Sequence, residues 1–324
     1  MIIDTHIGHD FLTKEVSDVG RSAFDVARDA QADFDLHYAT KGFIHPISND
    51  FVAPKYKNGK HRGKVTGKYI LRADNYEPLG DVSGKYPKRD GYKHIFRTME
   101  TLFPDTCTDM TVFGNGERLI MTQQIGDPIE LNGGDVIKPC VMTRMSLNSM
   151  WATGIFPIGQ RPSCGNVLEI EHSLISVKAT KNHDVMLTLR SAVLEASKLQ
   201  ADRLALFARQ ASNWSVSDFQ FHRMLNEILP EVDDEAPTRT KNLITAKRAA
   251  VVAAWRAETE RYDESNAWLV FNAFQGAEQH KINQGFKGGV QAEQKSLKKL
   301  AEGKTPIADA AQQYVNRVIM ADVG

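Results

Sequence analysis

Residues 110–125, MTVFGNGERLIMTQQI, carry the clearest fold signal in this chain. Two apolar runs flank Gly114-Asn115-Gly116, and a glycine-rich turn between such runs is typical of a β-hairpin. Asn58-Gly59 gives a second hairpin signal, between residues 51–57 and 64–72. Further short strands are predicted at residues 79–86, 136–151 and 153–158. The first half of the chain is therefore predicted to be antiparallel β-structure.

The second half has the apolar spacing of helices. Helices are predicted over residues 184–210, 241–262, 265–281 and 292–319, and Ser215 with Asp218 forms a capping-box pattern that opens a helix through Ile228. One helix is also expected in the first half, over residues 92–103, ending before Pro104. Strands followed by helices indicate an α+β fold: an N-terminal antiparallel β-sheet with hairpins and a packed helix, then a helical C-terminal half.

This order of elements divides the chain into four parts. They are an N-terminal segment (1–34), a β-rich domain with a basic face (35–180), a helical part of the same domain (181–285) and a C-terminal helical extension (286–324). Hydrophobic residues make up 42% and charged residues 25%, which is typical of a globular protein.

Several classes of protein are excluded by composition. No run approaches the roughly 18 apolar residues of a membrane span, and the first residues lack the features of an export signal. Cys107, Cys140 and Cys164 are too far apart for a disulfide framework or a zinc site. We therefore expect a cytoplasmic protein that uses no membrane, metal or cofactor.

Positive charge is concentrated in one window although the whole chain is neutral. Residues 55–97 contain twelve basic and four acidic residues, a net +8, together with five of the eight tyrosines. Basic side chains interleaved with aromatic ones favour a surface that binds a polyanion. The alternative is a solvated hairpin whose lysines pair with acidic residues elsewhere in the chain.

Alternation along residues 64–72 predicts which way each side chain points. Lys64, Lys68 and Arg72 share one face with Ile70, and Tyr69 lies on the other. Burying the first face would bury three cations, so we expect that face to be exposed and positive. Tyr69 is then expected in the core.

Known catalytic motifs do not appear in the chain. The nearest approach to a phosphate-binding loop, at Gly80–Lys85, is one residue short and lacks the hydroxyl that binds magnesium. Cys164 and His172 form a conceivable nucleophile pair with Asn166 nearby, and a structural cysteine in a turn is the alternative.

Three sequence blocks, in order, resemble the phage/plasmid-like protein family, a domain of unknown function. They are RADNYEPLGDVSGKY at residues 72–86, RPSCGNVL at 161–168 with His172, and WLVFNAFQGAEQH at 268–280. Glu171, Gln275 and Gly276 depart from the family pattern. The resemblance implies a phage-encoded or other mobile-element protein, and the order of strands and helices is similar, at the level of fold, to phage single-strand annealing proteins.

We weigh three functions. The first is non-catalytic binding and annealing of single-stranded DNA in recombination or replication by a homo-oligomer, with DNA or RNA left open. The second is an accessory or anti-defence protein that binds a host protein, and the third is a nucleic-acid enzyme. For the first, we expect the contacts to phosphates and bases to come from Lys57, Lys60, Arg62, Lys64, Lys68, Arg72, Lys85, Lys88, Arg89, Tyr56 and Tyr86.

Overall fold

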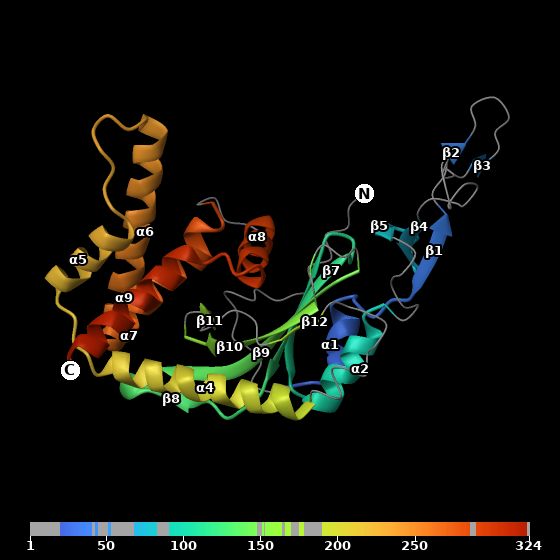
Figure 1. The fold of residues 1–324 in the computed structure, drawn as a ribbon, viewed down its shortest axis with the longest axis horizontal. Helices are drawn as coiled ribbons and strands as arrows, with labels where there is room; N and C mark the ends of the chain where they lie inside the picture. The colour runs from blue at the N-terminus through green and yellow to red at the C-terminus, as the bar shows by residue number, and fades with distance from the viewer. Residues whose placement is uncertain are drawn as a thin grey trace, which may run out of the picture.

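The computed structural model describes residues 20–40, 43–44, 51–52, 68–82, 91–147, 151, 153–163, 166–169, 175–177, 190–285 and 290–322. It confirms the α+β class, with strands first and helices after (Figure 1). The strands are β1 (Leu36–Thr40), β2 (Phe43–Ile44), β3 (Phe51–Val52), β4 (Lys68–Arg72), β5 (Pro78–Val82), β6 (Cys107–Phe113), β7 (Arg118–Gln124), β8 (Ile129–Glu130), β9 (Val136–Ser146), β10 (Thr153–Arg161), β11 (Asn166–Glu169) and β12 (Ile175–Val177). The helices are α1 (Ala23–Asp29), α2 (Lys93–Leu102), α4 (Arg190–Ser212), α5 (Asp218–Ile228), α6 (Thr238–Tyr262), α7 (Ala267–Ala277), α8 (Val290–Ala301) and α9 (Pro306–Asp322), with the short turns η2 (Asn132–Gly134) and η3 (Glu278–Ile282).

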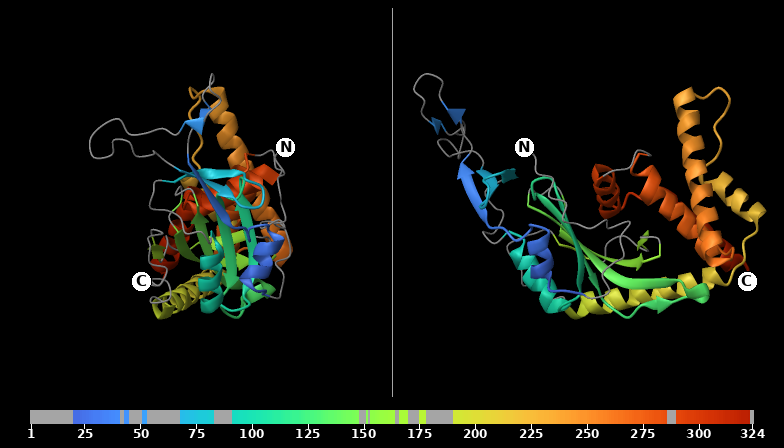
Figure 2. Two further views of the ribbon diagram at one scale, coloured as in Figure 1. Left: turned by 90° about the vertical axis from the view of Figure 1, so that its right-hand side faces the viewer. Right: turned by 180° about the vertical axis from the view of Figure 1, so that it is seen from behind.

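The larger sheet is antiparallel, with strand order β11-β10-β9-β7-β6; β12 also pairs with β10, and β8 with β9. A separate three-stranded sheet, β1-β4-β5, is here called the arm, and β2 pairs with β3. In Figures 1 and 2 the molecule is elongated, with the arm toward one end and helices α5 to α7 toward the other. The long strands β9 and β10 join the two ends.

Both faces of the larger sheet are covered. On one face Leu119 and Met121 of β7 belong to the same buried cluster as Phe96 and Met99 of α2. On the other face the buried cluster joins strand side chains to α8, through residues that include Ile120, Cys140, Met142, Leu297 and Leu300. Because successive residues of a strand point to opposite faces, a central strand covered on both sides is apolar throughout. This explains why the middle of β9 is buried without alternation.

A third cluster of buried side chains lies among the C-terminal helices. Trp255 of α6 stacks on Phe221 of α5, with ring centroids 3.8 Å apart and an angle of 16° between the planes. Phe274 of α7 lies at their side, 6.2 Å from Phe221. Large aromatic side chains bury much apolar area, so α5, α6 and α7 form one packed unit.

Among the described residues, no helix combines the length and the apolar character needed to cross a bilayer.

The hairpin at Gly114–Gly116 and the helix before Pro104 are confirmed. β6 and β7 pair in antiparallel register, and Gly114 and Gly116 have φ of 62° and 107°, which glycine adopts without strain. The other predicted hairpin turn, Asn58-Gly59, lies outside the described residues. β3 pairs with β2 and β4 with β1 and β5, so the described parts of the two predicted partner strands do not pair with each other.

Two predicted helix boundaries were wrong. The capping box of α5 uses Ser217 and Gln220, because the backbone of Ser215 forms a β-bridge with Asn266 and is not free to cap. The predicted helix over residues 292–319 is two helices, α8 and α9. Gly303, with φ of 63°, ends the first, and Pro306 begins the second, where its missing N–H is not needed.

Glu278 connects α9 to α7. Its side chain is 2% exposed and its carboxylate oxygens accept hydrogen bonds from the backbone N–H groups of Ile307 and Ala308, at 3.4 and 2.8 Å. These groups open α9, so the carboxylate satisfies donors that the helix leaves unpaired. Burial nevertheless raises the pKa of Glu278 to about 7, because it disfavours the charged form more than the two N–H groups favour it.

Glu278 should therefore make the stability of the fold depend on pH. The pKa of Glu278 rises from 4.5 to about 7 on folding. The contribution of the protonated carboxyl to the free energy of unfolding is therefore fully present below about pH 4.5 and is lost as the pH rises through 7. Relative to Glu278→Gln, which cannot ionise, the free energy of unfolding of the parent chain should fall between pH 5 and 8 by up to about 3 kcal/mol. Urea unfolding at several pH values measures this.

Glu235→Gln is the matched control, because Glu235 is exposed and lies in the loop before α6. Its free energy of unfolding should equal that of the parent within about 0.5 kcal/mol. A difference between the parent and Glu278→Gln that is constant from pH 5 to pH 8 would contradict the assignment.

Candidate functional site

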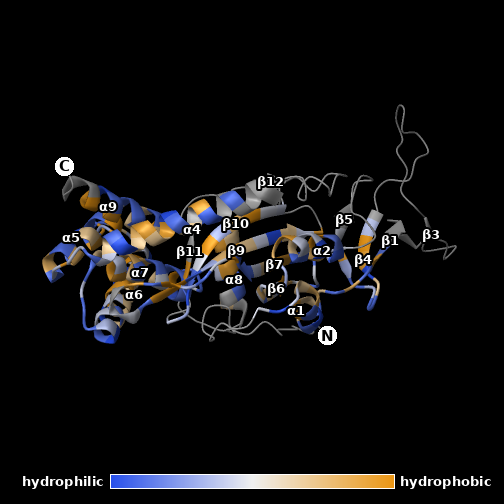
Figure 3. Ribbon diagram, turned by 90° about the horizontal axis from the view of Figure 1, so that it is seen from below, coloured by the Kyte–Doolittle hydropathy of each residue, from blue (hydrophilic) through white to orange (hydrophobic). Residues whose placement is uncertain are grey.

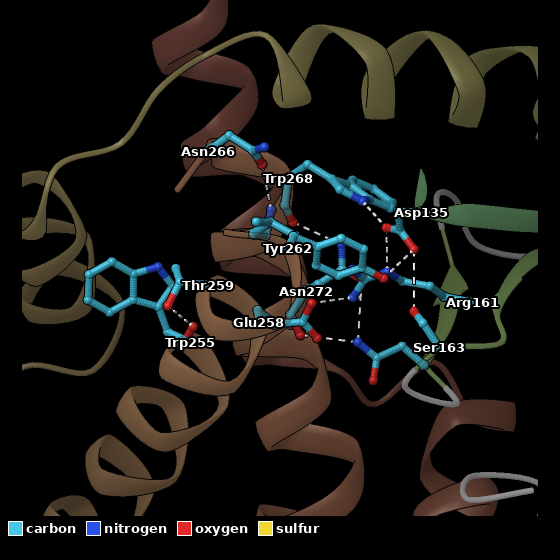
Figure 4. Close-up of polar contacts among 12 residues, drawn as sticks. Asp135, Arg161, Ser163, Trp255, Glu258, Thr259, Tyr262, Asn266, Trp268 and Asn272 are labelled. Carbon is cyan, nitrogen blue, oxygen red and sulfur yellow. Dashed lines mark hydrogen bonds and ion pairs between the residues drawn. The ribbon is translucent and has the colours of Figure 1, made fainter. Parts of the chain in front are cut away.

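A buried ion-pair network joins the sheet to the helices, and we call it the polar junction (Figure 4). At its centre Arg161, the last residue of β10, is fully buried. Its Nε donates to Oδ2 of Asp135 at 2.6 Å and its Nη1 donates to Oε2 of Glu258 at 2.7 Å. The two carboxylates come from distant parts of the sequence, Asp135 just before β9 and Glu258 on α6. One guanidinium therefore ties the strand to the helix.

Asp135 accepts three further hydrogen bonds from side chains. The Trp268 indole Nε1 donates at 2.8 Å, the Tyr262 hydroxyl at 2.9 Å and the Ser163 hydroxyl at 3.3 Å (Figure 4). The Arg161 guanidinium also lies 5.1 Å from the centre of the Tyr262 ring. Burial raises the pKa of Tyr262, which keeps its hydroxyl protonated as a donor. The polar junction comprises these six residues: Asp135, Arg161, Ser163, Glu258, Tyr262 and Trp268.

Local backbone geometry places these side chains. Gly133 and Gly134 have φ of 78° and 81°, a left-handed conformation that turns the chain from β8 into β9 and brings Asp135 to the start of that strand. The side chain of Asn266 accepts a hydrogen bond from the N–H of Leu269 and so caps α7, which holds Trp268 in the first turn. The turn and the cap set the approach of Asp135 and Trp268.

Beside the polar junction lie four buried amide side chains and one half-buried histidine, which we call the amide layer: Asn166, Asn272, Gln275, Gln279 and His280. Asn166 Nδ2 donates to the Asn272 carbonyl oxygen at 3.1 Å, and Asn166 Oδ1 lies 2.9 Å from Nε2 of His280. A Cβ added to Gly276 would lie 3.0 Å from Asn166 Oδ1, so glycine at this position allows the close approach.

The same layer completes the hydrogen bonding of β11, the edge strand of the larger sheet. The Val167 N–H donates to Oε1 of Gln279 at 3.0 Å, and the Val167 carbonyl accepts from Gln279 and Gln275 at 2.7 and 2.8 Å. An unpaired strand edge offers backbone groups to another chain. Here two glutamine side chains take the place of a neighbouring strand.

The described groups of the polar junction and the amide layer bind one another across two halves of the chain. This supports a structural role, that of holding α6 and α7 against β9, β10 and β11.

A cavity of about 390 Å³ lies elsewhere, between α5, α7 and α9, where Trp214, Met224 and Val315 are among its lining residues. No three His, Cys, Asp or Glu side chains in the described ranges are grouped to hold a metal ion.

The structure can be compared with only part of the predicted nucleophile site. Cys164 and His172 are outside the described residues, and Asn166 belongs to the amide layer. Cys107 and Cys140 are buried free thiols. Burial raises the pKa of both, that of Cys140 to about 12, so neither has the thiolate character of a nucleophile.

The prediction that the face of β4 with Ile70 and Arg72 is exposed, and that Tyr69 is in the core, was wrong. Ile70 is fully buried and Arg72 is 7% exposed, whereas Tyr69 on the opposite face is 39% exposed. The face that carries Ile70 packs on the core, and Arg72 follows it inward, where its Nη2 and Nε donate to the Asp74 carboxylate at 2.7 and 3.0 Å. Its guanidinium also lies 4.1 Å above the ring of Phe34. Paired and covered in this way, Arg72 is not a surface cation.

Other predicted contacts fall largely outside the described residues. Lys68 begins β4 and its side chain is not described. Nine of the predicted contacts lie in segments that the structure does not describe: Tyr56, Lys57, Lys60, Arg62, Lys64, Lys85, Tyr86, Lys88 and Arg89. Lys93, another cation of the basic window, contacts Asp35 and Asp33 at 3.0 and 3.3 Å.

The outer face of the arm carries aromatic rings that the sequence interpretation did not bring together. Register pairs His37 with Leu71, and Tyr69 lies two residues from Leu71 along β4, so His37 and Tyr69 share a face. Tyr76, in the turn between β4 and β5, is 65% exposed and stacks on His37 with 5.7 Å between ring centroids and 3° between planes. The left-handed backbone of Tyr76, with φ of 58°, positions its ring there.

Two segments rich in cations adjoin the strand ends of the arm. Lys68 pairs with Val82 in register, and also with Thr40. The sequence just before Lys68 (53–67) and just after Val82 (83–90) contains eight cations and one acid, Asp90. We call these two segments the cationic stretches. They join the arm at adjacent positions of neighbouring strands.

Replacing Arg161 should unfold the junction. In Arg161→Met two buried carboxylates lose their shared cation, and breaking a buried pair in this way costs about 3–5 kcal/mol. We expect a fall of that size in the free energy of unfolding, measured by urea denaturation followed by tryptophan fluorescence. The same change at Arg28, whose pair with Asp25 is exposed, should cost about 0–1 kcal/mol. Equal losses in the two variants would argue against a junction that holds the halves together.

Comparison with known proteins bears on the junction and not on the arm. The family model described as "Domain of unknown function (DUF932)" matches residues 91–304, which is 214 of the 324 residues. No curated protein and no solved structure matches the chain. The matched region contains all of the polar junction and the amide layer, and it begins after β5, so the arm and the cationic stretches precede it. By this match, the chain belongs to the DUF932 family.

Proposed function

We propose that this protein binds single-stranded nucleic acid, with single-stranded DNA as the expected ligand, and that it does so without catalysis. The observation that carries the proposal is the outer face of the arm. Exposed aromatic rings lie on this face, and the cationic stretches join the same small sheet at its paired strand ends. Rings that stack on bases beside cations that neutralise phosphates are the two parts of a general single-strand binding surface.

The cationic stretches supply the charge. They contain Lys55, Lys57, Lys60, Arg62, Lys64, Lys85, Lys88 and Arg89. Arg72, one of the contacts predicted from the sequence, is engaged by the Asp74 carboxylate within the fold, so the proposal does not include it as a phosphate ligand. Eight cations against one acid are enough to neutralise about six phosphates. Nucleic acid that follows both stretches would pass the strand ends of the arm.

The aromatic rings supply contacts that every base can make. Tyr76 presents most of its ring to solvent while His37 supports the other side, and Tyr69 lies farther along the same face. Stacking depends on the flat face of a base and tolerates any sequence. Tyr56 and Tyr86, within the cationic stretches, remain candidates for further stacking.

The biological setting belongs to the same proposal. The resemblance to phage and plasmid proteins favours a mobile-element protein that anneals strands in recombination or replication within the cytoplasm of a bacterial host, as a homo-oligomer. The polar junction is assigned a structural role in this proposal, because its described carboxylates are already bound by internal donors.

Removing the exposed ring should weaken binding. Tyr76→Ala is expected to reduce the affinity for a fluorescent 30-nucleotide single strand about 5- to 150-fold, since a stacked base contributes about 1–3 kcal/mol. Tyr76→Phe keeps the ring and should bind like the parent. Fluorescence anisotropy at one fixed salt concentration measures both.

Phe219→Ala is the matched control for the loss of an exposed aromatic ring, because Phe219 on α5 is 77% exposed and lies at the other end of the chain's described fold. Its affinity should equal that of the parent. If Tyr76→Ala and Phe219→Ala both bind as tightly as the parent chain, the arm is not the binding surface.

Salt dependence tests the cationic stretches separately. With about six phosphates neutralised, the logarithm of the binding constant should fall with the logarithm of the salt concentration with a slope near −4. The triple variant Lys57→Ala/Lys60→Ala/Arg62→Ala should reduce that slope by about 2. Equal slopes for parent and variant, or binding that does not change with salt, would refute the assignment. Capture of a nuclease-resistant protein partner instead would favour the accessory function.

A further inference from the structure

We infer that the outer face of α4 binds a second copy of this chain, with the two α4 helices antiparallel. The inference specifies the homo-oligomer of the proposed function, on which it rests only for the expectation that the chain self-associates. It uses no residue of the arm, so the two surfaces can be tested one at a time.

One side of α4 packs on the rest of the protein. Leu204, Phe207, Ala208 and Ala211 are at most 7% exposed and belong to the cluster formed with α7 and α9. The opposite side faces outward at the edge of the molecule, as Figures 1 and 3 show. It carries two large apolar side chains, Leu199 at 51% and Leu206 at 58% exposure. A helix that only faced water would carry polar side chains there.

Among the α4 side chains that the structure describes, eight are exposed and share one face: Glu195, Lys198, Leu199, Asp202, Arg203, Leu206, Arg209 and Gln210. Five of them, Glu195, Leu199, Asp202, Leu206 and Arg209, follow one another along this face as a stripe, at intervals of 4, 3, 4 and 3 residues. This is the spacing with which one helix meets another along a seam. At about 1.5 Å per residue, the stripe is roughly 21 Å long, enough for a helix-to-helix contact of four turns. Its two leucines lie in the middle and its ends have opposite charges.

The charges select the orientation of the second copy. Glu195 and Arg209 each lie seven residues from Asp202, one on either side. A two-fold axis near Asp202 therefore brings Glu195 of each copy opposite Arg209 of the other, and Leu199 next to Leu206. A parallel arrangement would instead place Glu195 against Glu195 and Arg209 against Arg209. Like charges in contact are unfavourable, so the stripe is complementary to itself only when antiparallel.

Near the axis, Asp202 of each copy meets its counterpart with the exposed Arg203 of each copy beside it, so acidic and basic groups are both present there. The terminal charges have no such mixture, because Glu195 of one copy faces Arg209 of the other. Replacing either terminal charge should therefore weaken the pair.

Exchange of the terminal charges is the decisive test. The dissociation constant of the full-length chain, without nucleic acid, is measured by sedimentation velocity over a range of concentrations. Glu195→Arg and Arg209→Glu should each raise it at least tenfold, since each change breaks two symmetric contacts, and the double exchange should restore it to within about threefold of the parent. Leu199→Gln/Leu206→Gln should abolish the dimer.

Leu243→Gln is the control, because Leu243 on α6 is 46% exposed and lies off the stripe; its dissociation constant should be that of the parent. Circular dichroism and thermal unfolding establish that each variant folds. A parent chain that is monomeric throughout overturns the inference, as does a double exchange that stays as weak as the single ones. Dimerisation through α4 in a chain that binds no single-stranded DNA would leave this inference standing and refute the proposed function.

Discussion

One buried cation, Arg161, determines how the two halves of this protein meet. A guanidinium with no exposed surface needs charge partners, and it finds them in Asp135 at the start of β9 and Glu258 on α6. Neither carboxylate is near Arg161 in sequence, so the pairs form only when helices and sheet are in their final positions. The cost of burying an unpaired charge thus restricts the chain to arrangements in which all three residues converge.

The amide layer extends that constraint to the edge of the sheet. Gln275 and Gln279 satisfy the backbone of Val167, and Asn166 contacts Asn272 and His280, so β11 is held by side chains of α7 and η3. Two blocks of the family resemblance, at residues 161–168 and 268–280, are therefore the two sides of one contact. Their shared chemistry is that of helix-to-sheet attachment, and the arm lies outside the region that the family model matches.

Parts of this arrangement were predictable because their causes are local. The glycines at 114 and 116 specify the β6–β7 turn, and Pro104 ends α2 wherever those residues sit in the fold. The orientation of β4 was not predictable in this way, since period-two alternation says which residues share a face but not which face is covered. Three cations predicted that their face of β4 is exposed, but Ile70 on the same face packs on the core. Arg72 is therefore buried with it, where it pairs with Asp74 and lies over the ring of Phe34.

The sequence alone established the α+β class, the order of strands and helices, the concentration of cations and tyrosines, and the blocks that resemble a family, because each is a property of neighbouring residues. Only the tertiary structure joined Asp135 and Glu258 to Arg161, and only it placed Tyr76 on His37. Those contacts span tens of residues or more, and they depend on how strands pair and which surfaces are buried. A side chain's partners are chosen by packing across the whole fold, and that choice leaves little trace in the residues beside it.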